Sequence, residues 1–145
     1  MLLFKKKFLE QIRNGEKTQT IRFWKYRRMK SGQRSYIPGV GYIAVESVEP
    51  VELSRLTKAD AVLDGFLSAA SLRKEIRTLY TAEERKMLTP FRIRFSVFPP
   101  HEQQKITQER QMQKQEQNRD VLQQEFVNQT LDKLLKMTKS DENRG

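Results

Sequence analysis

The fold is decided by the stretch Gly15–Arg22, which reads GEKTQTIR. An amphipathic helix precedes it, and a glycine is typical of a helix C-terminus because glycine adopts left-handed backbone angles at little cost. The residues that follow are expected to form a strand, with Thr18, Thr20 and Arg22 on one face and Lys17 on the other. A lysine, two hydroxyls and an arginine so close together could bind an anion or a nucleobase edge, or could activate a threonine hydroxyl.

Positive charge is concentrated at the start of the chain. The net charge is +10 over 145 residues, and residues 1–34 hold 11 basic and 2 acidic residues, a balance of +9. Residues 35–98 have a balance of +1, and residues 99–145 have a balance of zero. A field this concentrated attracts polyanions, whereas a merely solvated surface usually spreads its charges. The distribution therefore favours a nucleic-acid ligand.

The composition excludes several kinds of site. The chain has no cysteine, so disulfides and thiolate metal sites are excluded, and its single histidine, His101, rules out a histidine-rich metal centre. Two-metal hydrolysis needs clustered carboxylates, but the basic region offers only Glu10 and Glu16. We therefore expect neither a metal nor another cofactor. No apolar run approaches the roughly 20 residues that span a bilayer, and the N-terminus is unlike a secretory signal, so we expect a cytoplasmic protein.

The apolar periodicity predicts an α+β domain over residues 1–98. Strands are expected at residues 2–4, 17–24, 42–53 and 91–98. Helices are expected at residues 5–14, 57–65, 70–79 and from 81 to just before Pro90. Capping patterns begin the helices at Thr57 and Thr81, and Pro50 indicates a break, a bulge or an edge position in the long strand. This order favours a small curved sheet or open β-barrel with flanking helices.

The composition changes after residue 98. Residues 101–145 hold ten glutamines and one aromatic residue, and residues 102–119 are almost purely polar. Residues 99–145 are therefore interpreted as a glutamine-rich extension, either a floppy tail or one or two helices that dock on the domain or on another chain. An apolar stripe is expected within residues 121–137, formed by Leu122, Phe126, Leu131, Leu134 and Leu135.

The motif G-x-K-x-x-x-x-R at residues 15–22 is accompanied by two later patterns. These are Leu56–Asp60, followed by Asp64–Phe66, and a final Phe-Ile-Phe strand. Together with the order of elements, they make residues 1–98 resemble the ASCH family of small β-barrel domains, which are related to the PUA fold. The resemblance implies a cleft beside the G-x-K motif, with RNA or a nucleotide as its occupant.

Some bacterial members of that family share a Gly-x-Lys-Thr-x-Thr-Ile-Arg stretch and are similar enough to imply N4-acetylcytidine amidohydrolase activity. The resemblance then implies Lys17 as the base and Thr20 as the nucleophile. The proton donor is a glutamate on the later helix, where this chain has Ser71. Glu75 lies one turn further along the same helix face and could replace it. A lysine that acts as a base needs a lowered pKa, from burial or from neighbouring cations.

Aromatic and basic residues alternate in residues 23–30, FWKYRRMK. Such a segment suits single-stranded nucleic acid, because rings stack on bases while charges follow phosphates. Alternation places Trp24 on the face of Arg22, so we expect Trp24 in the cleft. Arg22 could clamp a phosphate or a base edge, or could pair with Glu46 or Glu75. Further phosphate contacts are expected from Arg27, Arg28, Lys30 and Arg34.

The main prediction is a domain that binds RNA, or single-stranded nucleic acid, through a basic cleft. The cleft residues are Lys17, Thr20, Arg22 and Trp24, with Arg27, Arg28, Lys30 and Arg34 around them. The first alternative is a metal-independent amidohydrolase acting on N4-acetylcytidine through Lys17, Thr20 and Glu75. The second is an adaptor whose residues 121–137 bind a second copy or a protein partner.

Overall fold

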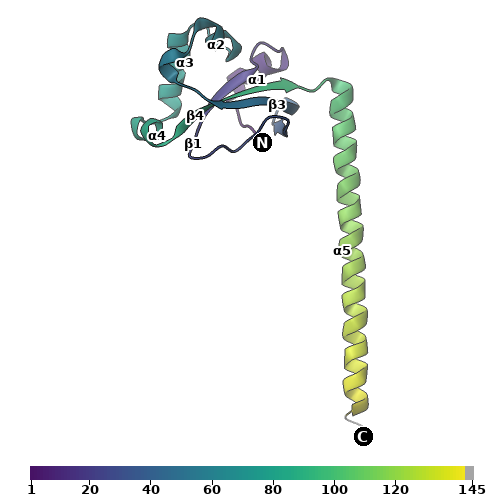
Figure 1. Ribbon diagram of the computed structural model, residues 1–145. Helices are drawn as coiled ribbons and strands as arrows, with labels where there is room; N and C mark the ends of the chain where they lie inside the picture. The colour runs from purple at the N-terminus through teal and green to yellow at the C-terminus, as the bar shows by residue number, and fades with distance from the viewer. Residues whose placement is uncertain (143–145) are drawn as a thin grey trace. The chain divides into compact units, whose positions relative to one another are not determined.

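A computed structural model describes residues 1–142 (Figure 1). The chain divides into two compact units, residues 1–103 and the residues from 104 onward. The strands are β1 (Gln19–Trp24), β2 (Arg34–Ile37), β3 (Gly41–Pro50) and β4 (Thr89–Val97). The helices are α1 (Lys6–Arg13), η1 (Leu53–Arg55, a 3-10 turn), α2 (Lys58–Leu63), α3 (Ala69–Leu79), α4 (Ala82–Met87) and α5 (Pro100–Glu142). The α+β class is confirmed.

The four strands form one antiparallel sheet in the order β1-β4-β3-β2. In the register of β1 and β4, Thr20 lies opposite Ile93 and Arg22 opposite Phe91. A bulge between Val45 and Ser47 bends β3. The sheet has β1 and β2 as its edges and does not close within residues 1–142, so the expected barrel is not confirmed.

Two expected strand positions are wrong. Residues 2–4 form no strand, because their one main-chain hydrogen bond to a strand, from the Leu2 amide to the Tyr36 carbonyl at 3.0 Å, makes no ladder before the chain turns into α1. The second strand begins at Gln19 instead of Lys17. The amides of Lys17 and Thr18 instead donate to the carbonyls at the ends of α1 and α2.

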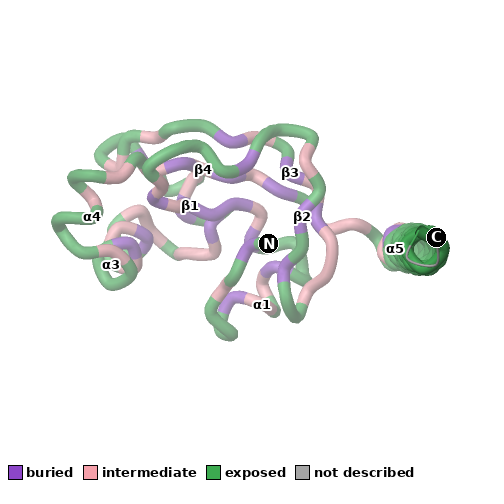
Figure 2. Tube along the Cα trace, turned by 90° about the horizontal axis from the view of Figure 1, so that it is seen from below, coloured by how far each residue is buried: buried purple, intermediate pink, exposed green. Residues whose placement is uncertain are grey.

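Apolar residues gather in two clusters, and Figure 2 shows buried segments along β1, β4 and β3 and on the inner sides of α1 and α3. The first cluster joins α1, through Phe8 and Ile12, to β3 and β4. The second joins Ile21 and Phe23 of β1 to α2 and α3. Phe66 packs against both clusters. The edge strand β1 therefore lies where the two clusters meet.

The helix starts follow the capping signals in the sequence. Thr57 accepts a hydrogen bond from the Asp60 amide while the Asp60 carboxylate accepts one from the Thr57 amide, and Thr81 and Glu84 form the same capping box at α4. Both capping predictions are confirmed. The cap at Thr57 begins the short helix α2, whose C-cap is Asp64.

The extension forms a single helix, α5, over the 43 residues Pro100–Glu142, rather than a floppy tail. The residues of the expected apolar stripe are between 54% and 70% exposed. Within residues 1–142 no helix has the length and apolar character needed to cross a bilayer.

Removing the α2 cap tests how far the short helix depends on it. We expect Thr57→Ala to lower the free energy of unfolding by about 1 kcal/mol, because the Asp60 amide loses its acceptor. The control is Thr78→Ala within α3, where alanine is the better helix former. Urea titrations monitored by circular dichroism should show the loss for Thr57→Ala only. Equal midpoints for the two variants would contradict the role of the cap.

Candidate functional site

The site begins at the C-terminal end of α1. Gly15 has a φ of +76°, which allows its amide to bond back to Ile12 while the Glu16 amide bonds to Gln11. This glycine-terminated arrangement is a Schellman motif, and it satisfies carbonyls that the helix would otherwise leave unpaired. The Lys17 amide also donates to the Gln11 carbonyl, at 3.1 Å. The motif thus turns the chain so that Lys17 enters the domain.

The C-terminal end of α2 is built in the same way. Gly65, with a φ of +89°, donates to Val62, and Phe66 donates to Ala61. The positive φ of Gly65 favours glycine, because other residues adopt left-handed backbone angles only at a cost. The turn leaves Asp64 with its carboxylate and its carbonyl directed at Lys17.

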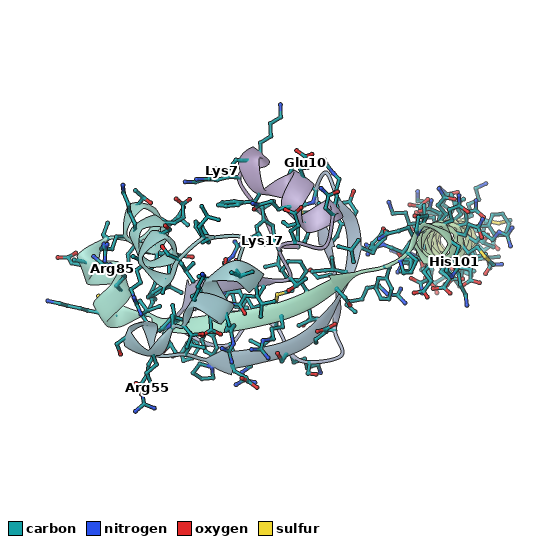
Figure 3. The ribbon with its side chains drawn as sticks, turned by 90° about the horizontal axis from the view of Figure 1, so that it is seen from above. Lys7, Glu10, Lys17, Arg55, Arg85 and His101 are labelled. Carbon is teal, nitrogen blue, oxygen red and sulfur yellow. The ribbon has the colours of Figure 1, made fainter. Side chains whose placement is uncertain are left out.

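Lys17 and Asp64 form a buried ion pair between the two helix ends. The Lys17 Nζ atom lies 2.5 Å from Asp64 Oδ1 and also donates to the Asp64 carbonyl, and each residue is 3% exposed. Gln19 donates to the other carboxylate oxygen at 3.4 Å. Figure 3 shows Lys17 in the interior of the domain. The carbonyl of Asp64 at the end of α2 also faces the ammonium, and its partial negative charge helps to offset the cost of burying it.

Three aromatic rings complete the surroundings of the Lys17 ammonium. Their centroids lie 4.9 Å (Phe8), 5.6 Å (Phe66) and 5.8 Å (Phe4) from Nζ, within the range of cation–π attraction. Burial lowers the pKa of Lys17, although the charge of Asp64 acts in the opposite direction. Burial likewise raises the pKa of Asp64, against the effect of Lys17. Both shifts favour the neutral forms, as desolvation should.

A cavity of about 210 Å³ lies beside this pair. Its buried lining residues include Lys17, Thr20, Ile21 and Asp64, which form the floor. The walls are mostly apolar or aromatic and comprise Phe4, Phe8, Phe66, Leu72, Ile76 and Tyr80. The more exposed lining residues mark the mouth, namely Leu3, Lys5 and Leu79. Most of the wall surface is therefore uncharged.

Thr20 and Arg22 enter the cavity together, as the alternation of β1 requires. Arg22 Nε donates to Thr20 Oγ1 at 3.1 Å, and Arg22 Nη2 donates to the Leu3 carbonyl at 2.6 Å. The guanidinium carbon lies 4.7 Å from the centroid of the Phe4 ring. Burial lowers the pKa of Arg22. The arginine is thus held in place by the domain itself, and its bonds are not to Glu46 or Glu75.

The open edge of β1 contributes main-chain groups. In an antiparallel pair, alternate residues direct their main-chain groups toward the partner strand. The Thr18 carbonyl accepts from Phe95 of β4, whereas the Phe23 amide donates away from β4, to the Tyr80 hydroxyl at 3.4 Å. The odd-numbered residues of β1 therefore direct their main-chain groups away from β4. Ile21 is one of them, and it lines the cavity. Its N–H and C=O therefore point toward the cavity side of the strand.

At the mouth, Glu75 joins α3 to the start of α1. Its Oε1 atom lies 3.1 Å from Lys5 Nζ and 3.2 Å from Lys7 Nζ. Burial raises the pKa of Glu75, but the hydrogen bonds from the two lysines outweigh that effect and hold the pKa below its usual value. Ser71 bonds to Ser68 at the start of α3 and does not line the cavity. Of these two helix positions, only Glu75 faces the site.

The structure separates the other expected residues from the cavity. Trp24 packs on Phe91, with 5.7 Å between ring centroids, and does not line the cavity. It shares a sheet face with Arg22, but two residues along a strand move it by nearly 7 Å. Three of the expected phosphate contacts are exposed in the loop that follows β1, and the fourth begins β2: Arg27, Arg28, Lys30 and Arg34. None of these four residues lines the cavity, and we refer to them together as the basic surface.

Sequence reasoning missed Asp64 as a site residue, although it stands in the Asp64–Phe66 pattern. The available signal was an acidic residue at a helix end next to a glycine, but nothing local connects it to Lys17, which is 47 residues away. Within residues 1–142 no three histidine, cysteine, aspartate or glutamate residues gather as a metal site would require.

Comparisons with known proteins place this geometry on a known fold. No family model and no curated protein sequence matches the chain. The hypothetical protein PH0355 superimposes with a TM-score of 0.56 and 21% identity, covering 66% of this chain and 95% of its own. An ASCH domain from Lactobacillus crispatus JV V101 superimposes with a TM-score of 0.53 and 16% identity, covering 61% and 69%. The domain has an ASCH-like fold.

Neutralising one partner of the buried pair should destabilise the ASCH-like domain. We expect Asp64→Asn to lower the free energy of unfolding by about 3–5 kcal/mol at neutral pH, because the Lys17 ammonium stays buried without its counter-ion. The double variant Lys17→Met/Asp64→Leu should recover a large part of the loss. Chemical denaturation compares the three proteins, and a double variant less stable than Asp64→Asn would contradict this account.

The pH dependence of the Asp64→Asn variant follows from the lowered pKa of Lys17. Above that lowered pKa and below the ordinary lysine value of about 10.4, the unfolded chain binds a proton that the folded chain does not. The stability of the variant should therefore rise with pH through this window. A flat profile would show that the buried lysine is not the cause of the loss.

Proposed function

We propose that the ASCH-like domain binds single-stranded RNA, or another single-stranded nucleic acid, with one unpaired base in the cavity. The observation that supports this most directly is the cavity itself, which combines apolar walls with a floor of fixed polar groups. Recognised single-stranded bases are typically splayed out, packed against aromatic rings and hydrogen-bonded at their edges. The resemblance described above implies the same class of occupant.

The charge balance of the floor favours a base over a phosphate. Lys17 is compensated by Asp64, and two of the N–H groups of Arg22 are used within the domain. An uncharged ring with polar edges fits such surroundings better than a dianion, which would need unpaired cations. The Thr20 hydroxyl and the outward main-chain groups of Ile21 can supply the donors and acceptors that a base edge requires.

The basic surface after β1 provides the contacts to the backbone of the nucleic acid. Arg27, Arg28 and Lys30 are exposed, and Tyr26, which is 73% exposed, can stack on a base. Such contacts are largely independent of sequence, because phosphates and ring faces occur at every nucleotide. The cavity would then discriminate among bases while this surface supplies general affinity.

Salt dependence tests the nucleic-acid proposal. Binding of a fluorescein-labelled 12-nucleotide RNA of mixed sequence should weaken steeply with salt, because released counter-ions drive the association. Arg27→Ala/Arg28→Ala should weaken binding of all sequences alike and reduce the slope of log K against log salt by about 1.4, at about 0.7 per phosphate contact.

The control is Arg55→Ala/Lys58→Ala, which removes the same charge from two exposed residues outside the basic surface. It should leave the slope near that of the unchanged protein. Fluorescence anisotropy at four salt concentrations measures all three slopes. A slope near zero for the unchanged protein would reject nucleic-acid binding.

A second candidate, the amidohydrolase, is favoured by one observation: Lys17, Thr20 and Glu75 line the same cavity, and burial lowers the pKa of Lys17. The Thr20 oxygen would attack the acetyl carbonyl of N4-acetylcytidine, the C–N bond would break as N4 takes a proton, and water would release acetate. Two contacts argue against it. The Lys17 ammonium bonds to Asp64 rather than to Thr20, and two lysines keep Glu75 ionised.

Direct incubation separates the two candidates. We expect the protein to release no cytidine from N4-acetylcytidine beyond the buffer blank, as measured by liquid chromatography. The matched variants are Thr20→Ala, in the cavity, and Thr18→Ala, outside its lining. Cytidine release that Thr20→Ala abolishes and Thr18→Ala retains would establish the enzyme and reverse our preference.

A further inference from the structure

Two cations at the start of α1, Lys5 and Lys7, lie at Glu75, which lines the cavity, and are more exposed than Lys17. Lys5 and Lys7 are about half exposed, at 49% and 56%, and both form an ion pair with the same oxygen of Glu75. Figure 3 shows Lys7 on α1 at the outside of the domain, in contrast to the interior position of Lys17. Two ammonium groups thus share a single carboxylate, which leaves an excess of one positive charge at the mouth.

The two cations inside the domain, Lys17 and Arg22, are less available to bind a phosphate. Lys17 would have to give up Asp64 within a buried environment, and breaking such a pair is costly. Arg22 would have to release Thr20 or the Leu3 carbonyl. By contrast, the Lys5 and Lys7 side chains are about half exposed, although the Glu75 side chain is 15% exposed, so exchanging Glu75 for another anion costs less than breaking the buried pair of Lys17 and Asp64.

We propose that Lys5 and Lys7 form a phosphate subsite, in which the phosphate next to the bound base replaces the Glu75 carboxylate. This inference rests on the proposed function, since the nucleotide is positioned by its base in the cavity. Lys5 and Glu75 both line the cavity, so a phosphate attached to its occupant emerges between them. Glu75 therefore occupies the anion position in the free protein and competes with the ligand.

This role makes Glu75 a determinant of affinity that acts through the two lysines. A terminal phosphate monoester carries more charge and more acceptor oxygens than a carboxylate, so it satisfies two lysines better than Glu75 does. Removing the Glu75 charge should then strengthen the binding of nucleotides. A general acid or a purely structural ion pair predicts no such gain.

The test compares nucleosides with nucleotides by isothermal titration calorimetry on the full chain. The probes are the four ribonucleosides, their 5′-monophosphates and inorganic phosphate alone. We expect at least one monophosphate to bind more tightly than its nucleoside and more tightly than inorganic phosphate. Glu75→Gln should raise this monophosphate-to-nucleoside affinity ratio by about two- to fivefold, the range that exposed ion pairs imply. Lys5→Ala/Lys7→Ala should bring the ratio close to one.

Two matched controls isolate the subsite. Lys6→Ala removes an exposed charge between the two lysines, and Glu10→Gln removes an exposed carboxylate from the same helix. Both should leave the ratio unchanged. Circular dichroism checks the fold of each variant, and Lys5→Gln/Lys7→Gln serves if the alanine variant unfolds.

The outcomes are distinguishable. If monophosphates keep their advantage in the double lysine variant, or if Glu75→Gln leaves the ratio unchanged, the subsite is wrong while base binding stands. If inorganic phosphate binds as tightly as the monophosphates, the subsite is not coupled to a base. If no nucleoside, no nucleotide and no RNA binds, the proposed function fails together with this inference.

Discussion

The buried contact between Lys17 and Asp64 fixes the geometry on which the rest of the site depends. Lys17 follows the glycine that ends α1, and Asp64 directly precedes the glycine that ends α2, so two separate helix ends meet at one ion pair. The Thr18 amide reinforces the junction by donating to the Leu63 carbonyl at 2.9 Å. Since an unpaired charge in such surroundings would cost several kcal/mol, neither helix end can move without the other.

The cavity exists because this junction lies beside the edge of the sheet. The first apolar cluster covers the side of α1, the second covers the sides of α2 and α3, and β1 has a neighbouring strand on one side only. The amide of Thr18, just before β1, donates to the Leu63 carbonyl, and the outward amide of Phe23 donates to the Tyr80 hydroxyl. The middle of the strand, at Ile21, instead faces the hollow. A ligand can therefore meet main-chain groups that an inner strand would have used in the sheet.

What the sequence could predict was local. The capping boxes at Thr57 and Thr81 involve residues three positions apart, and the helix end at Gly15 is set by its own backbone, so these features were readable without tertiary structure. The sequence could not predict Asp64 as the partner of Lys17, because the two residues lie in segments far apart along the chain. The prediction that Trp24 lies in the cleft was wrong for another reason. Alternation gives the face of the strand on which a side chain lies, but not how far along the strand the cavity extends.

The same distribution of contacts underlies our preference for binding over hydrolysis at this site. A catalytic lysine must exchange a proton with the reacting group, but the nearest acceptor of the Lys17 ammonium is Asp64, which holds it from two directions. A catalytic acid must carry a proton, but Glu75 is kept ionised by Lys5 and Lys7. The groups of the floor are thus fixed by the fold and can select a shape and a hydrogen-bonding pattern. The charges that can rearrange lie at the mouth, where exchanging one anion for another needs no change in the core.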